Sequence, residues 1–124
     1  TIDINLFEPE RLKNFPEIER IEGDSASAEV ISEVVNKFEG EAIDLIYIDG
    51  DHKYESTMAA YSIYTTLLKP KFVIFDDITL NDSMFRMWRD VLKTHGDRVL
   101  NTVEVEPAIR PESTNPGFGI SQIR

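Results

Sequence analysis

The chain has 124 residues, and its 23 acidic against 13 basic side chains give a formal net charge of -10 at pH 7. This charge repels nucleic-acid phosphates and anionic lipids, so we expect neither nucleic acid nor a membrane as a partner. The absence of cysteine excludes disulfides and thiolate metal sites and suits a cytoplasmic protein. A chain of this length, of which 41% is hydrophobic, is expected to build one domain.

The predicted elements alternate between strands and helices. Residues 1–5 and 17–23 alternate apolar and polar side chains and are predicted strands, with a short helix over 8–15 between them. The elements expected after these are a helix over 26–40, a strand over 42–49, a helix over 54–68, a strand over 71–77, a helix over 83–96, and two strands over 98–106 and 117–124. The last two strands are expected to form an antiparallel hairpin.

This alternation predicts an α/β fold, a doubly wound and mainly parallel sheet with helices on its faces. Ligands of such sheets bind outside the carboxyl ends of the strands. Four of the predicted strands end in acids at that edge: Asp3, Asp24, Asp49, and Asp76 with Asp77. A single acid at a strand end is common in turns, but four acidic strand ends indicate a functional edge.

The middle of the chain carries a resemblance to a known family. The stretch "DLIYIDGDHKYESTMAAYSIYTTLLKPKFVIFDD" at residues 44–77 resembles the class I S-adenosylmethionine-dependent methyltransferases, in particular the small-molecule O-methyltransferase branch. In that branch a D-G-D-H phrase precedes a helix and a strand that ends in two acids. The resemblance implies a Rossmann-like fold and methyl transfer from S-adenosyl-L-methionine to a small hydroxylated acceptor.

The resemblance also implies where the cofactor binds. Asp3 falls where the family places an acid that binds the ribose hydroxyls, and Asp24 with Ser25 falls in the loop that contacts the adenine. Asp49, at the end of the next strand, is counted with these cofactor-binding residues. A plainer interpretation of Asp24 and Ser25 is a capping signal for the helix that follows them.

Metal-dependent members hold a divalent cation on acids that correspond to Asp49, Asp76 and Asp77, and their general base corresponds to His52. Three converging carboxylates raise one another's pKa, and a hard cation such as Mg²⁺ resolves this conflict. An imidazole can remove a hydroxyl proton near neutral pH. We expect Gly50 to permit the tight turn that returns His52 to the strand edge, while Asp51 is left outside the metal set.

One family feature has no counterpart. The glycine-rich loop after the family's first strand is missing, and residues 1–124 are therefore expected to be a partial methyltransferase domain, a fragment of a longer protein. In the family's strand numbering the expected order is 3-2-(1)-4-5-7-6, with strand one absent. A missing central strand leaves unpaired backbone groups, so we also expect the chain to form a homo-oligomer.

Two other functions compete with this interpretation. In the first, the "DGD" of residues 49–51 is the metal-diphosphate motif of a nucleotide-sugar glycosyltransferase, which leaves Asp76 and Asp77 without a role. In the second, the chain is a truncated, non-catalytic Rossmann-like domain that only folds and associates.

Overall fold

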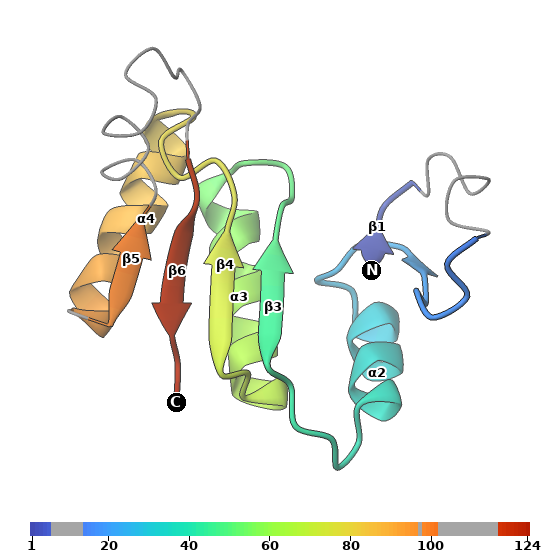
Figure 1. Cartoon of the computed structure of the whole chain (residues 1–124). Helices are drawn as coiled ribbons and strands as arrows, with labels where there is room; N and C mark the ends of the chain where they lie inside the picture. Colours follow the sequence, from blue (N-terminus) through green and yellow to red (C-terminus); the bar gives the residue numbers. More distant parts are fainter. Residues whose placement is uncertain (6–13, 97, 102–116) are drawn as a thin grey trace. The chain divides into compact units, whose positions relative to one another are not determined.

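The computed structural model forms two compact units, an N-terminal unit of Thr1–Glu39 and a C-terminal unit of Gly40–Arg124 (Figure 1). The residues that the structure describes are 1–5, 14–96, 98–101 and 117–124. Each unit is built on its own strands and helices, and the unit boundary follows the helix that closes the first.

The N-terminal unit consists of two short strands and one helix. Strands β1 (Ile2–Asp3) and β2 (Ile21–Glu22) pair in parallel, with Asp3 opposite Glu22. Helix α2 (Ala28–Lys37) follows, and its N-cap is Ser27, whose hydroxyl accepts a hydrogen bond from the amide of Val30. The cap is therefore Ser27 and not Asp24 or Ser25, although the helix lies within the predicted range.

The C-terminal unit is a four-stranded sheet with two helices. Its elements are β3 (Leu45–Ile48), α3 (Tyr54–Leu68), β4 (Phe72–Phe75), α4 (Asp82–His95), β5 (Val99–Asn101) and β6 (Gly119–Gln122). The strand order is β3-β4-β6-β5, in which β3 and β4 are parallel and β6 runs antiparallel to both of its neighbours. Figure 1 shows α3 behind the β3 and β4 strands.

Period-two alternation along β3 and β4 separates a helix-facing side from an open side. Val73 and Phe75 are 1% and 0% exposed and belong to the core that α4 completes with Met87, Trp88 and other apolar side chains. Leu45 and Tyr47 are 49% and 53% exposed, because alternate residues of a strand point to opposite faces. If the alternation continues past the strand ends, Asp49 and Asp76 lie on the same face as Leu45 and Tyr47.

A glycine on β6 allows α4 to pack closely. A Cβ atom at Gly119 would lie 2.3 Å from the ring of Trp88, far inside van der Waals contact. The indole of Trp88 is 4% exposed, so it has no room to move aside. Trp88 is thus a core residue, and the absence of a side chain at Gly119 lets its ring rest on the sheet.

The α/β class with parallel strand pairs and an antiparallel C-terminal pair is confirmed, and the helix over 54–68 has the predicted bounds. The strand predicted over 98–106 is described as far as Asn101, and nearly all of the helix predicted over 8–15 lies outside the described residues. The strand order of a single joined sheet, the absent strand and the single domain over 1–124 remain predictions. Within the described part of the chain, no helix is long and apolar enough to cross a membrane.

Candidate metal and catalytic site

Two acids lie at the same level of the sheet because their strands are in register. Ile48 and Phe75 are the last paired residues of β3 and β4, so Asp49 and Asp76 leave adjacent strands side by side. The amide of Asp76 donates a 3.0 Å hydrogen bond to the carbonyl of Ile48, which continues the ladder one step beyond the strands. The parallel pairing thus delivers both carboxylates to one edge.

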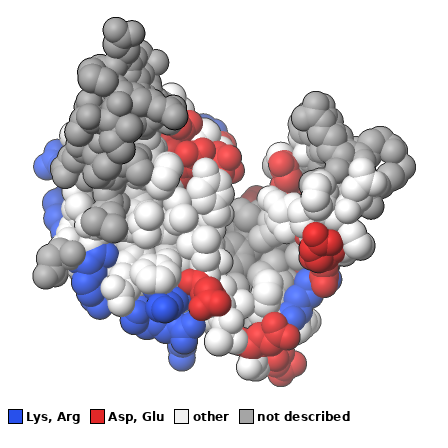
Figure 2. Space-filling view, viewed as in Figure 1, with Lys and Arg blue, Asp and Glu red and all other residues white. Residues whose placement is uncertain are grey.

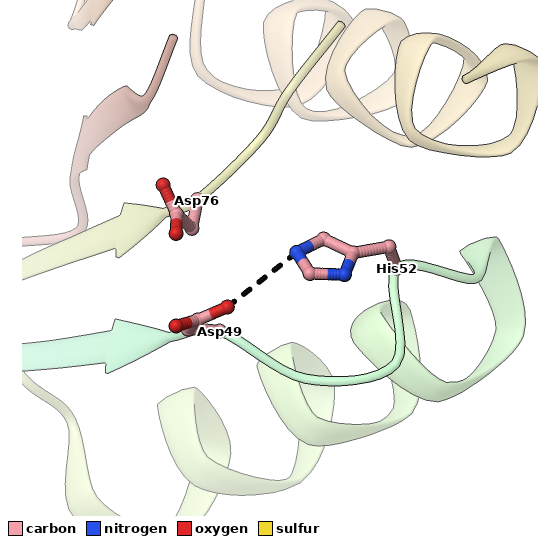
Figure 3. Close-up of side chains that lie close together, drawn as sticks. All are labelled: Asp49, His52 and Asp76. Carbon is pink, nitrogen blue, oxygen red and sulfur yellow. Dashed lines mark ion pairs between the residues drawn. The ribbon is translucent and has the colours of Figure 1, made fainter. Parts of the chain in front are cut away.

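The loop after β3 turns His52 back toward these acids. Its Nε2 atom lies 3.4 Å from Oδ1 of Asp49 and 3.3 Å from Oδ2 of Asp77. Figure 3 shows the ring pointing from the loop toward the ends of both strands. Although the atom is buried, it makes no hydrogen bond of acceptable geometry with either oxygen.

The turn is made differently from the expected way. His52 has a φ of 53°, in the left-handed region, whereas Gly50 is not among the residues with positive φ. Asp77, on the neighbouring loop, also has a left-handed φ of 50°. Left-handed backbone is uncommon outside glycine and is tolerated best by Asn, Asp and His, which are the residue types found here. The expectation that Gly50 makes the turn was therefore wrong.

Among the described residues, Asp49, His52 and Asp76 form a group that could hold a metal ion, with one ligand atom from each lying within 4.8 Å of the others. Ligands of a Mg²⁺ ion are about 3 Å apart when adjacent and about 4.2 Å apart when opposite, so the three atoms would have to draw together to bind one ion. The two carboxylates suit Mg²⁺ or Mn²⁺, whereas an imidazole nitrogen is a more usual ligand of Zn²⁺ or Fe²⁺. Asp77, expected as a ligand, stands beside this group and contacts His52.

Tyr47 belongs to the same region and was not foreseen. Although the side chain is half-exposed, partial desolvation, a hydrogen bond with Asp76 and the negative charges of Asp76, Asp49 and Asp77 together raise the pKa of Tyr47 to about 12. The sequence does hold a signal for this contact, because Tyr47 lies two residues before Asp49 and therefore on the same strand face.

Asp51 is held away from the cluster. Its carboxylate accepts a 2.7 Å hydrogen bond from the ammonium of Lys53 and another from the hydroxyl of Ser56. These hydrogen bonds lower the pKa of Asp51. The residue thus serves the turn before α3, in agreement with its exclusion from the metal set.

The three cofactor residues expected in the N-terminal unit lie at the carboxyl end of its two strands. Oδ1 of Asp3 accepts a hydrogen bond of 3.0 Å from the amide of Asn5, and Oδ1 of Asp24 accepts one of 2.8 Å from the amide of Ala26. Both acids are exposed, and Ser25 is half-buried. Their role in cofactor binding remains a prediction.

A family model described as a methyltransferase domain matches residues 6–78, which is more than half of the chain. The chain therefore belongs to this family of methyltransferases. The matched stretch contains Asp24, Ser25 and the whole cluster of Asp49, His52, Asp76 and Asp77, while Asp3 lies outside it. No curated protein and no solved structure matches the chain. The membership replaces the nucleotide-sugar glycosyltransferase interpretation.

Proposed function

We propose that the protein is an S-adenosyl-L-methionine-dependent O-methyltransferase, assisted by a divalent cation, that acts on a small hydroxylated acceptor. The observation that carries this proposal is the convergence of three carboxylates and one imidazole at the ends of β3 and β4 in a member of a methyltransferase family. Methyl transfer to a hydroxyl group needs a proton acceptor and a means to stabilise the oxyanion, and this cluster offers both.

Asp49, Asp76 and Asp77 are the proposed ligands of the cation. A bound Mg²⁺ ion would act as a Lewis acid that lowers the pKa of the acceptor hydroxyl. Carboxylate oxygens are the ligands that this ion prefers, and the neutral oxygens of the acceptor fit the coordination positions that the protein leaves open.

His52 is the proposed general base, and Nε2 is the atom that accepts the proton. We assign this nitrogen to proton transfer because a nitrogen that binds a cation has no lone pair left for a proton. The carboxylates of Asp49 and Asp77, at 3.4 and 3.3 Å, would stabilise the imidazolium that forms. The proton is thereby moved from the acceptor to the protein in the step that creates the nucleophile.

The cofactor supplies the methyl group, and the protein supplies its position. Asp3, Asp24 and Ser25 are proposed to bind the ribose and adenine, since acids after parallel strands are placed to accept hydrogen bonds from hydroxyl and amino groups. Alignment of the acceptor oxygen with the methyl carbon is then the main contribution of the fold to the rate.

The test is a transfer assay with the protein expressed from its complete coding sequence. Isotope-labelled S-adenosyl-L-methionine is offered with a panel of small phenols and alcohols, each paired with the analogue whose hydroxyl is already methylated. We expect Mg²⁺-dependent label transfer to the hydroxylated member of a pair alone. Undiminished transfer in excess chelator would refute the metal role, and a melting temperature unmoved by S-adenosylhomocysteine would refute the cofactor.

We also propose that the protein forms a homo-oligomer in the cytoplasm. Among the described strands of the C-terminal unit, β3 pairs with β4 on one side, which leaves its other backbone edge available for another strand. Light scattering over a range of concentrations tests this. A monomer at the highest concentration would show that the edge of β3 is covered within one chain.

A further inference from the structure

Asn81 connects two loops that the fold brings together. Its Oδ1 atom accepts a 2.9 Å hydrogen bond from the amide of Met84, which makes it the N-cap of α4. Its Nδ2 atom donates a 3.2 Å hydrogen bond to the carbonyl oxygen of His52. One amide side chain therefore uses its acceptor for its own helix and its donor for the loop that carries the imidazole.

A second connection lies beside the first. The hydroxyl of Ser83, in the first turn of α4, accepts a 2.6 Å hydrogen bond from the amide of Tyr54, the first residue of α3. The N-cap of α3 is Lys53, which makes no capping hydrogen bond with its side chain. The start of α3 is thus capped from α4, and the two contacts enclose Lys53 between them.

These contacts explain how His52 keeps its conformation. A left-handed φ such as its 53° costs about 1–2 kcal/mol for a residue with a Cβ atom, so the surroundings must hold it. The backbone conformation sets the direction of the Cα–Cβ bond, from which the ring extends in one of its staggered rotamers. The hydrogen bond from Asn81 restrains this backbone, and in the conformation it holds Nε2 of the ring reaches Asp49 and Asp77.

We infer that Asn81 is a positioning residue, which holds the backbone of His52 so that Nε2 stays among the carboxylates. It acts through His52 and does not itself touch the reacting atoms. Asn81 lies beyond the residues 6–78 that the family model matches. A contribution of Asn81 to catalysis rests on the proposed function. Its effect on the position of the His52 ring can be measured whether or not that function is correct.

The competing explanation is that Asn81 only caps α4, and two substitutions separate the roles. Asp and Ser cap helices about as well as Asn, but neither has an amide that can donate to the carbonyl of His52. Asn81→Asp preserves the shape of the side chain, and Asn81→Ser introduces no charge. Asn81→Ala, which loses both hydrogen bonds, and Ser27→Ala, which removes the cap of α2 alone, complete the set.

The readout is the nuclear magnetic resonance of the imidazole rings. The chain has two histidines, and His95, at the end of α4, serves as an internal reference. At constant pH and without metal, we expect the ring signals of His52 to shift or broaden in both Asn81→Asp and Asn81→Ser, while those of His95 stay in place. The melting temperatures of these two variants should remain close to that of the wild type.

Manganese binding and turnover provide the functional measurements. Because His52 is the proposed base and not a ligand, we expect the Mn²⁺ affinity, measured by electron paramagnetic resonance, to stay within a few-fold in both variants, whereas turnover should fall about 10-fold, a typical loss when a residue that orients the site is removed. Ser27→Ala should bind Mn²⁺ like the wild type.

Unchanged His52 signals in the two variants, or equal shifts at His95, would overturn the inference and leave Asn81 as a helix cap. A wild-type protein that binds no Mn²⁺ would refute the metal part of the proposed function. The ring comparison would still decide whether Asn81 positions His52.

Discussion

The two units contain the same motif, a parallel strand pair followed by acids, and use it differently. In the N-terminal unit, Asp3 and Asp24 each accept a hydrogen bond from a backbone amide two residues further along. In the C-terminal unit, Asp49 and Asp77 come from different loops and lie 3.4 and 3.3 Å from one imidazole nitrogen. Local turns satisfy the first pair, and a contact between loops organises the second.

The difference indicates that acids at strand ends form a candidate binding site when they share a partner such as His52, which contacts acids from two loops. Figure 2 shows acidic side chains on both units, so negative charge alone does not distinguish them. In the C-terminal unit, Asp76 follows Phe75, whose side chain is 0% exposed. Packing of Phe75 in the core restrains the backbone at the end of β4 and thereby the direction of the Asp76 carboxylate.

The largest effect is expected at Asp76, because the C-terminal unit differs from the N-terminal unit only if its acids bind a cation. Asp76→Asn removes a charge from the proposed ligand set, and we expect Mg²⁺-dependent turnover to vanish. Residues that merely orient a metal site cost 10–100-fold in affinity, so loss of a ligand should lower the Mn²⁺ affinity by at least about 100-fold. Asp24→Asn is the control from the N-terminal unit and should bind Mn²⁺ normally. Similar calorimetric affinities for both variants would remove the distinction between the units.

Replacement of His52 tests what the imidazole contributes. His52→Ala should lower turnover by about 100-fold or more, the usual loss of a general base, while the Mn²⁺ affinity stays within a few-fold. The matched control is His95→Gln, which should leave turnover unchanged. Loss of ion binding in His52→Ala would instead make His52 a ligand, which is the arrangement of the Asp49, His52 and Asp76 group.

A substitution in the core tests whether the C-terminal site depends on packing. In Gly119→Ala the new methyl group would meet the ring of Trp88 at 2.3 Å, and overpacking of this kind costs about 1–3 kcal/mol of unfolding free energy. The chain has one tryptophan, so urea unfolding followed by its fluorescence reports on this contact. Gly50→Ala, where the methyl group would meet nothing within 4 Å, should change stability by less than about 0.5 kcal/mol. Equal stability of the two variants would contradict the close packing of Trp88.

The smallest effect is expected for the cap of α2. Ser27→Ala removes the hydrogen bond to the amide of Val30 and should cost about 1 kcal/mol of helix stability. Because the lost hydrogen bond lies at the start of α2, hydrogen exchange should accelerate in α2 and remain unchanged in α3 and α4. Faster exchange in the C-terminal helices would show that the two units are energetically linked.

Local patterns predicted the elements well. The helix predicted over 54–68 has these bounds in α3, and the helix predicted over 83–96 differs from α4 by one residue at each end. The acids of the cluster were predicted as well, because parallel strands in a sheet expose their carboxyl ends at one edge. These features depend on residues close to one another in sequence or on the general geometry of sheets.

The features that escaped prediction depend on contacts between distant residues. The hydrogen bond from Asn81 to His52 joins residues 29 positions apart, and the sequence around either residue does not predict it. The left-handed residue of the turn is His52 rather than Gly50, since the contacts of the loop outweigh the conformational freedom of glycine. Tyr47 needed the register of β3 before its hydroxyl could be placed beside Asp76.

The position of β6 has a consequence for synthesis of the protein on the ribosome. This strand lies between β4 and β5 but follows both of them in the chain, so the two earlier strands emerge without the partner that joins them. Until residues 119–122 leave the exit tunnel, one edge of β4 is unpaired and Trp88 lacks the sheet surface on which it rests. An unpaired apolar strand of this kind invites aggregation, so the nascent chain is expected to pass through a chaperone-dependent interval that ends when β6 inserts.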